Sequence, residues 1–199
     1  LAEAPAEVPV SKVSLLSAED RTKVLETWNR TGKEHDRTLC LHQLFEAQVE
    51  KTPDAPAVVF EGQTLTYAEL NGRANQLARH LRSLGVGPDV LVGVYVERSL
   101  ELMVAIYAVH KAGGAYLPLD PAFPEDRIGY MVEDAKAPVV IANGHLAPRL
   151  SAGSARVVRI DTDRAHFSSF ENDDLTDTFF FNDTATTEIY TSGSTGRPK

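Results

Sequence analysis

The chain has 199 residues, 43% hydrophobic and 24% charged, which is ordinary for a globular protein. Its formal net charge of −8 and scattered basic residues argue against binding to nucleic acid or to an anionic membrane surface. A single cysteine, Cys40, excludes an internal disulfide or a thiolate metal site, and we interpret it as a small, half-buried apolar residue. No apolar run reaches about 18 residues, which excludes a membrane-spanning helix.

Both ends of the sequence look like cuts. The chain begins on Leu1 rather than Met and stops on Lys199 with no helix or turn to finish it. Residues 1–10 lack a basic region followed by an apolar core, so they do not form a secretion signal, and we expect a cytoplasmic protein. Residues 1–38 are interpreted as a linker that contains a short helix over 17–28, with a serine N-cap.

From residue 39 onward, helical and strand patterns alternate between turn residues. The expected elements are a helix over 41–51, a strand over 57–60, a helix from 66 to 81, a strand over 90–96, a helix from 99 to 113, a strand over 115–119, a helix from 124, and strands over 139–142 and 156–160. Strands that alternate with single helices are typical of right-handed crossovers. The sequence therefore predicts an α/β fold with a mainly parallel sheet.

The last nine residues, Thr191–Lys199, combine glycines with hydroxyl side chains. Gly193 and Gly196 let the backbone turn tightly, and the hydroxyl and exposed N–H groups can form a cradle for an anion. This is not a Walker A loop, because no Gly-Lys-Ser/Thr tripeptide follows at the right spacing. Taken alone, such a run is also typical of a solvated loop or linker.

The residue order over Tyr190–Lys199 resembles the phosphate-loop signature of adenylate-forming enzymes. That superfamily contains acyl-CoA ligases, luciferases and the adenylation domains of nonribosomal peptide synthetases. The resemblance implies that the loop contacts the β- and γ-phosphates of ATP. The residues that it assigns to phosphate binding are Thr191, Ser192, Gly193, Ser194, Thr195, Gly196 and Lys199.

Earlier motifs narrow the resemblance to peptide-synthetase adenylation domains. Leu65–Leu70 resembles their first core motif, and Lys111–Asp120 resembles the second, which acyl-CoA ligases usually match poorly. Further agreement comes from Leu41–Glu46, Thr52–Ala55, Pro121, Pro124 and Arg127. Residues 15–29 resemble the connector that follows an upstream condensation domain. We therefore identify 1–38 as this connector and 39–199 as the truncated N-terminal portion of the adenylate-forming fold.

The resemblance implies a reaction in which ATP and an amino acid form an aminoacyl-adenylate and pyrophosphate, usually with Mg²⁺. The acyl group then passes to the phosphopantetheine thiol of a separate, downstream carrier domain. The catalytic residues are expected beyond residue 199, so we expect the 199-residue chain to be inactive alone. Two alternatives remain open: a carboxylate–CoA ligase of the same superfamily, and a non-catalytic docking fragment.

Several motif residues have a simpler structural explanation. Thr66 and Glu69 have the spacing of a capping box. Gly113 and Gly114 are typical of a helix stop. Lys111 falls in the last turn of a predicted helix, where we interpret it as a complement of the helix dipole.

Acidic and histidine side chains give no clear catalytic or metal pattern. Asp120 and Glu125 could pair as carboxylates, but we interpret them as solvated turn residues. The histidines show no ligand spacing, so we expect no metal site built from them. They are His35, His42, His80, His110, His145 and His166.

The segment before the phosphate loop departs from the family pattern. The family has a turn with Pro and Asn and then an apolar strand, whereas residues 179–188 are three Phe followed by a polar, Thr-rich run. This run does not alternate as a half-buried strand should. Residues 182–191 also resemble a literal translation of a common DNA-sequencing adapter. Our hypothesis is that adapter sequence occupies the frame over 179–188.

Overall fold

The computed structural model describes residues 16–32 and 39–175. Contacts divide the chain into two compact units, Leu1–Leu39 and Cys40–Lys199. The predicted phosphate loop and the unusual segment over 179–188 lie outside the described residues.

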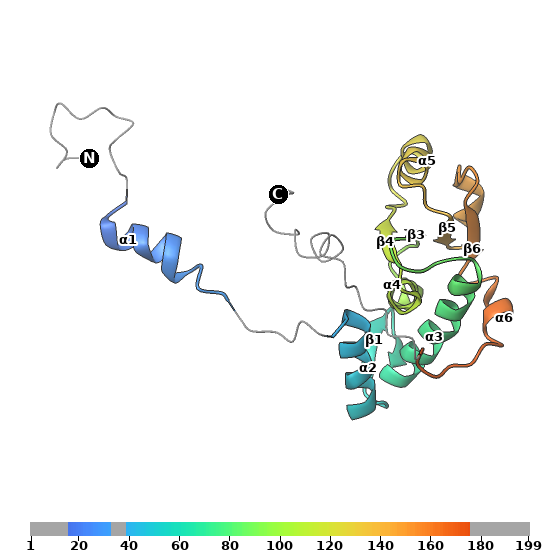
Figure 1. Ribbon diagram of the computed structural model, residues 1–199, viewed down its shortest axis with the longest axis horizontal. Helices are drawn as coiled ribbons and strands as arrows, with labels where there is room; N and C mark the ends of the chain where they lie inside the picture. Colours follow the sequence, from blue (N-terminus) through green and yellow to red (C-terminus); the bar gives the residue numbers. More distant parts are fainter. Residues whose placement is uncertain (1–15, 33–38, 176–199) are drawn as a thin grey trace. The chain divides into compact units, whose positions relative to one another are not determined.

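In the first unit, the α-helix α1 (Ala18–Thr22) runs directly into the π-helical turn η2 (Lys23–Thr27) (Figure 1). The predicted N-cap is confirmed, because the Ser17 hydroxyl accepts a hydrogen bond from the Asp20 backbone N–H at 3.0 Å. At the other end, the Asn29 side-chain amide donates to two backbone carbonyls of η2, at 2.8 and 3.0 Å. No residue of either element is buried.

The second unit begins with helix α2 (Leu41–Lys51), followed by an antiparallel hairpin. The hairpin strands are β1 (Pro56–Phe60) and β2 (Gln63–Thr66). Glu61 and Gly62, between them, have φ values of 48° and 77°, the left-handed pair that suits a two-residue hairpin turn. The sequence predicted β1 but not β2.

Helices and parallel strands then alternate through the rest of the described chain. In order, the elements are α3 (Tyr67–Ser83), β3 (Leu91–Tyr95), α4 (Leu100–Ala112), β4 (Ala115–Pro118), α5 (Glu125–Asp134), β5 (Val139–Ala142), η3 (Ala147–Arg149), β6 (Arg156–Arg159) and α6 (Arg164–Phe167). Strands β3 to β6 form one parallel sheet in the order β4-β3-β5-β6. The predicted α/β fold with a mainly parallel sheet is confirmed.

Helices cover both faces of this sheet (Figure 1). Side chains on one face, such as Val92 and Ile141, share a core with α3 and α4. Side chains on the other face, such as Tyr95 and Val140, share a second core with α5. Strands β3 and β5 therefore bury apolar side chains on both faces of the sheet. This explains why their sequences do not alternate between apolar and polar residues.

Local signals set the ends of α3 and α4 as the sequence predicted. Thr66 and Glu69 form a reciprocal capping box, with N···O distances of 3.2 and 2.9 Å. Helix α4 ends at Gly113, whose φ of 90° is a left-handed conformation that favours glycine.

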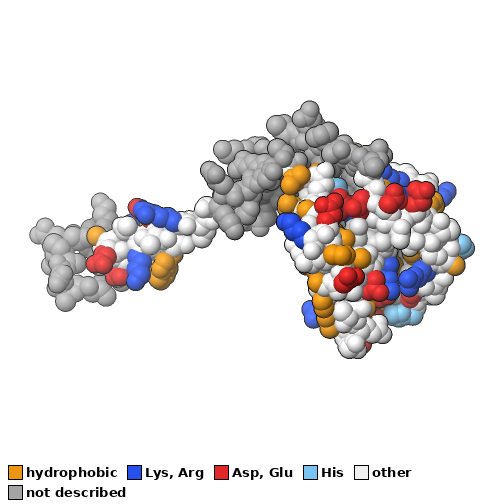
Figure 2. Space-filling model, turned by 90° about the horizontal axis from the view of Figure 1, so that it is seen from below, with side chains coloured by type: hydrophobic (Ala, Val, Ile, Leu, Met, Phe, Trp, Pro, Cys, Tyr) orange, Lys and Arg blue, Asp and Glu red, His pale blue; other side chains and the backbone are white. Residues whose placement is uncertain are grey.

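Acidic and basic side chains are intermingled on the face of the larger unit seen in Figure 2. No extended basic patch is visible among the described residues of that face. Within residues 16–32 and 39–175, no helix has both the length and the apolar character needed to cross a membrane.

Candidate functional site

Lys111 occupies the last turn of α4, and its side chain is 0% exposed. The sequence interpretation of this lysine as an ordinary dipole complement is corrected by this burial. A side chain that served only the helix dipole would keep its ammonium in water. A buried ammonium instead requires charged or hydrogen-bonding partners, because burial without them is very costly.

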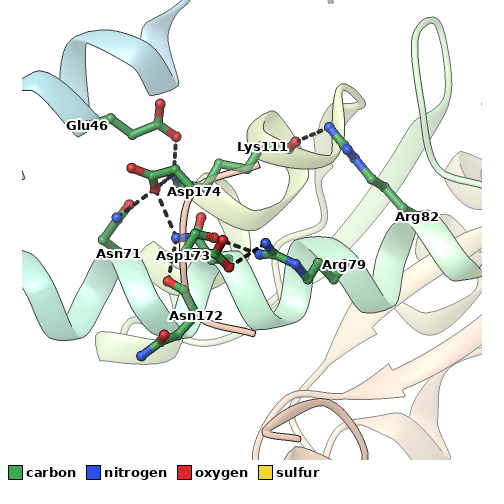
Figure 3. Close-up of polar contacts among 9 residues, drawn as sticks. Glu46, Asn71, Arg79, Arg82, Lys111, Asn172, Asp173 and Asp174 are labelled. Carbon is green, nitrogen blue, oxygen red and sulfur yellow. Dashed lines mark hydrogen bonds and ion pairs between the residues drawn. The ribbon is translucent and has the colours of Figure 1, made fainter. Parts of the chain in front are cut away.

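Two carboxylates supply the partners of the Lys111 ammonium (Figure 3). One is Glu46 on α2, whose Oε1 accepts a hydrogen bond from Nζ. The other is Asp174, whose Oδ1 lies 3.0 Å from Nζ. The lysine thus joins α4 to α2 and to the segment that follows α6.

Helix α3 adds two amides to the same carboxylate. The side-chain Nδ2 atoms of Asn71 and Asn75 donate to Asp174 Oδ1 at 2.8 and 2.9 Å. Asn75 also donates to the Asn172 backbone carbonyl at 2.8 Å. We refer to Glu46, Asn71, Asn75, Lys111 and Asp174 as the Lys111 cluster.

The two acids of the Lys111 cluster respond differently to their surroundings. Burial by itself raises the pKa of Asp174, but hydrogen bonds from Asn75, Asn71 and Lys111 and the lysine charge outweigh it, so this pKa lies below its usual value. Burial is also the largest influence on Glu46, and there it outweighs Lys111, so the pKa of Glu46 is raised. The hydrogen bonds and the lysine charge therefore favour the charged form of Asp174, whereas burial favours the neutral form of Glu46.

The segment around Asp174 is tied to α3 at several further points. Gln76 Nε2 donates to the backbone carbonyls of Ser168 and Phe170, at 2.9 and 3.1 Å. The Arg79 guanidinium donates to the Asp173 carbonyl at 2.7 Å and pairs with its carboxylate at 2.6 Å (Figure 3). The donors occupy one polar stripe of α3, and they hold the chain mainly through its backbone.

The contacts of the Lys111 cluster hold a chain segment in place. The Lys111 ammonium donates to carboxylates on two sides, and the cluster has no nucleophile activated by a base. In the described part of the chain, no group of three or more His, Cys, Asp or Glu side chains could hold a metal ion. The arrangement can fix a segment in place, and it offers no reacting group.

Comparison with known proteins identifies the family. A model of the AMP-binding enzyme family matches residues 45–199, which is most of the chain. The chain belongs to the AMP-binding enzyme family. Among its relatives, one subunit of the linear gramicidin synthase from Brevibacillus parabrevis is 50% identical over 187 residues, or 94% of this chain and 2% of that protein. Bacitracin synthase 1 from Bacillus licheniformis is 42% identical over 193 residues, or 97% of this chain and 4% of that protein.

Solved structures of peptide-synthetase adenylation domains have the same fold. The nonribosomal peptide synthetase FmoA3 (S1046A), bound to α-methyl-L-serine-AMP, gives a TM-score of 0.70 at 38% identity over 81% of this chain and 18% of that chain. NpsA–ThdA, an artificially fused adenylation–PCP di-domain from Klebsiella oxytoca, gives 0.60 at 25% identity over 65% of this chain and 24% of that chain. The chain thus spans a small part of each relative.

Within this AMP-binding family member, three residues of the second core motif have structural roles: Lys111, Gly114 and Asp120. The motif runs from Lys111 in α4 through β4 to Asp120. A Cβ on Gly114 would lie 2.8 Å from Val86 Cγ1 and 3.0 Å from the Val90 carbonyl oxygen, so this position must be glycine for close packing.

The two carboxylates near the end of that motif do not pair. Asp120 Oδ1 accepts a hydrogen bond from the Ala122 backbone N–H at 2.9 Å. Glu125 instead pairs with Arg149, at 3.1 Å. Both residues are exposed, as expected, but only Asp120 lies outside regular structure, and the interpretation of Glu125 as a turn residue is corrected because it is the first residue of α5.

The residues that the family resemblance assigns to ATP, Thr191–Gly196 and Lys199, lie outside the described residues. Sequence reasoning also passed over the partners of Lys111. A signal was available in α3, where Asn71, Asn75 and Arg79 recur every four residues and so share one face of the helix. Asp174 lies in a part of the sequence where no helix or strand was predicted, and no neighbouring residue indicates that its side chain binds a lysine.

Proposed function

We propose that the chain is the N-terminal portion of an adenylation domain that activates an amino acid with ATP. The products are an aminoacyl-adenylate and pyrophosphate. The observation that carries the proposal is the family match, which extends through residue 199 and so includes the loop. The relatives are peptide synthases, which favours an amino acid over the carboxylate substrate of a CoA ligase.

In this proposal the loop binds the triphosphate. Backbone N–H and hydroxyl groups of Thr191–Gly196 donate to phosphate oxygens, and Lys199 adds positive charge. Such donors stabilise the charge that develops as pyrophosphate leaves, together with a Mg²⁺ ion that neutralises part of it. In this proposal the loop residues position the phosphates and neutralise their charge, and they transfer no proton.

The proposed partners follow from the relatives. FmoA3 was solved with an aminoacyl-AMP, and NpsA–ThdA joins adenylation to a PCP module. We propose an amino-acid substrate, a downstream carrier domain with phosphopantetheine, and an upstream condensation domain joined through residues 1–38, all in the cytoplasm. Because this chain spans 18% of the FmoA3 chain, we propose that the 199 residues alone are inactive.

A chimera tests the activity. Residues 39–199, with the gramicidin synthase residues kept at 179–188, would replace the corresponding residues of an adenylation domain of the linear gramicidin synthase. Exchange of labelled pyrophosphate into ATP would then be measured with each amino acid. We expect exchange that depends on an amino acid. Lys199→Ala and Gly193→Val should each lower it about tenfold or more, because each removes or blocks a phosphate contact. Exchange that is unchanged by both loop variants would contradict the assignment of the loop.

The adapter hypothesis needs a matched pair of chimeras. One keeps residues 179–188, and the other carries the residues of the gramicidin synthase at these positions. We expect activity in the second and a large loss in the first, since a polar run would replace an apolar strand. A direct read of the source DNA from the codons of Arg156 to beyond Lys199 gives an independent answer. Codons for 179–188 in a clean genomic read would contradict the adapter origin.

A further inference from the structure

Helix α4 is apolar on every side for most of its length. From Leu100 to Val109 its only charged residue is Glu101, and every other residue is apolar or a tyrosine. No residue of α4 is exposed, and even those on its outer side, such as Leu102 and Ile106, are half-buried. A helix at the surface of a protein has a polar face, whereas a helix that is apolar all round is typical of one surrounded by protein.

Strand β4, beside this helix, lacks cover on the same side of the sheet. It is the edge strand of the described sheet, where it pairs with β3 alone (Figure 1). Leu117 packs against the core shared with α5, whereas Tyr116 and Pro118 point to the opposite face and are exposed. Parallel sheets occur almost only with both faces covered. The exposed half of β4 therefore indicates a missing layer.

The outer side of α4 and the exposed half of β4 line one groove of about 660 Å³. Protein interiors leave few voids larger than a water molecule, so a groove of this volume needs side chains from elsewhere to fill it. Most of its lining is apolar. The lining includes Val94, Leu102, Ile106, Tyr116, Pro118 and Phe123.

We propose that this groove is an internal interface of the adenylation domain, filled by the apolar face of an element from the remainder of the N-terminal subdomain. The inference rests on the proposed function, which makes the chain part of such a domain. The N-terminal subdomain of NpsA from Klebsiella oxytoca has the same fold, with a TM-score of 0.60 at 24% identity, over 67% of this chain and 34% of that subdomain. Most of that subdomain thus lies beyond the matched part. A second copy of this chain is a poorer occupant, because a stable dimer needs a larger interface than one such groove.

Hydroxyl-radical labelling of two tyrosines tests the cover without any substitution. Tyr116 in the groove is 39% exposed and Tyr130 on α5 is 67% exposed, so both should be labelled in the 199-residue chain. In the chimera we expect labelling of Tyr116 to fall about tenfold or more, because a side chain inside an interface meets solvent only through local opening. Tyr130 is the control and should keep its labelling.

Two outcomes of the labelling would overturn the proposal. One is equal labelling of Tyr116 in the 199-residue chain and in the folded chimera. The other is protection of Tyr116 in the 199-residue chain that grows with its concentration, which would identify a second copy as the occupant.

A substitution of Ile106 separates the interface from the core of the chain itself. Ile106 belongs to neither of the two cores, so Ile106→Asp should lower the urea midpoint of the 199-residue chain only slightly. In the chimera the same carboxylate would be buried without a partner, so we expect a large fall in the midpoint and renewed labelling of Tyr116. Tyr130→Asp, at an exposed side chain, should change neither midpoint. Equal effects of Ile106→Asp on the two proteins would contradict the interface.

The labelling and the urea midpoints need a folded chimera and not an active one. A folded chimera that protects Tyr116 but exchanges no pyrophosphate would therefore count against the proposed function and leave the interface standing.

Discussion

His42 on α2 shows how the buried cation affects its neighbours. The pKa of His42 is lowered to about 4, first by burial and then by the positive charges of Lys111, His110 and Arg82, with Asp174 acting in the opposite direction. The folded state therefore binds its proton less readily than the unfolded state, whose histidine titrates near 6.5. The resulting stability is fully present above pH 6.5 and is lost as the pH falls toward 4.

Replacing His42 should reduce this pH dependence. We expect His42→Gln to lose less free energy of unfolding than the wild type between pH 6.5 and pH 4. Urea unfolding at several pH values measures the difference. His80 and His110, whose pKa values are also lowered by burial, keep part of the slope in the variant. His145→Gln, at a side chain that is 59% exposed, is the control, and identical slopes for His42→Gln and the wild type would contradict the expectation.

Replacing the single residue Lys111 should also lower the stability of the fold. We expect Lys111→Met to lower the free energy of unfolding by about 2 to 4 kcal/mol, somewhat less than for a fully buried pair because Asp174 is partly exposed. Asp174 has a lowered pKa, so its own contribution is present at neutral pH and is lost only as the pH falls below about 4.

At the scale of elements, most helices and strands could be predicted because their signals are local. The ends of α3 depend on Thr66, Glu69 and a following glycine, and β3 and β5 are short apolar runs between turns. Strand β2 could not be predicted in this way, because only Leu65 of its four residues is buried and its last residue is also the cap of α3. The Lys111 cluster could not be predicted either, since Glu46 and Asp174 meet the lysine only in the folded chain.

Gly114, between α4 and β4, gives a prediction at this scale. Gly114→Ala would place a Cβ 2.8 Å from Val86 Cγ1 and 3.0 Å from the backbone oxygen of Val90, which cannot move without shifting the chain before β3. We expect a loss of about 1 to 3 kcal/mol in thermal or urea unfolding. Gly87→Ala, where an added Cβ meets nothing within 4 Å, should be close to neutral. Equal stabilities of the two variants would contradict the structural role given to this motif residue.

At the scale of the molecule, the described residues of the larger unit form a parallel sheet that helices cover on both faces. The parallel sheet and its helices hold the chain up to residue 175, and the residues that resemble the ATP loop come after it. The fold and the family follow from the sequence because the motifs of this family are long and nearly continuous over 39–143. The amino acid cannot be predicted, since none of the motifs over 39–143 is one that the resemblance assigns to amino-acid binding.

The most direct test of the central claim is pyrophosphate exchange by the chimera that carries residues 39–199 with the gramicidin synthase residues at 179–188. We expect labelled pyrophosphate to enter ATP only when an amino acid is present, and the rate to fall about tenfold or more in Lys199→Ala. A folded chimera that shows no exchange with any amino acid would contradict the claim that this chain supplies the ATP-binding part of an amino-acid-activating domain.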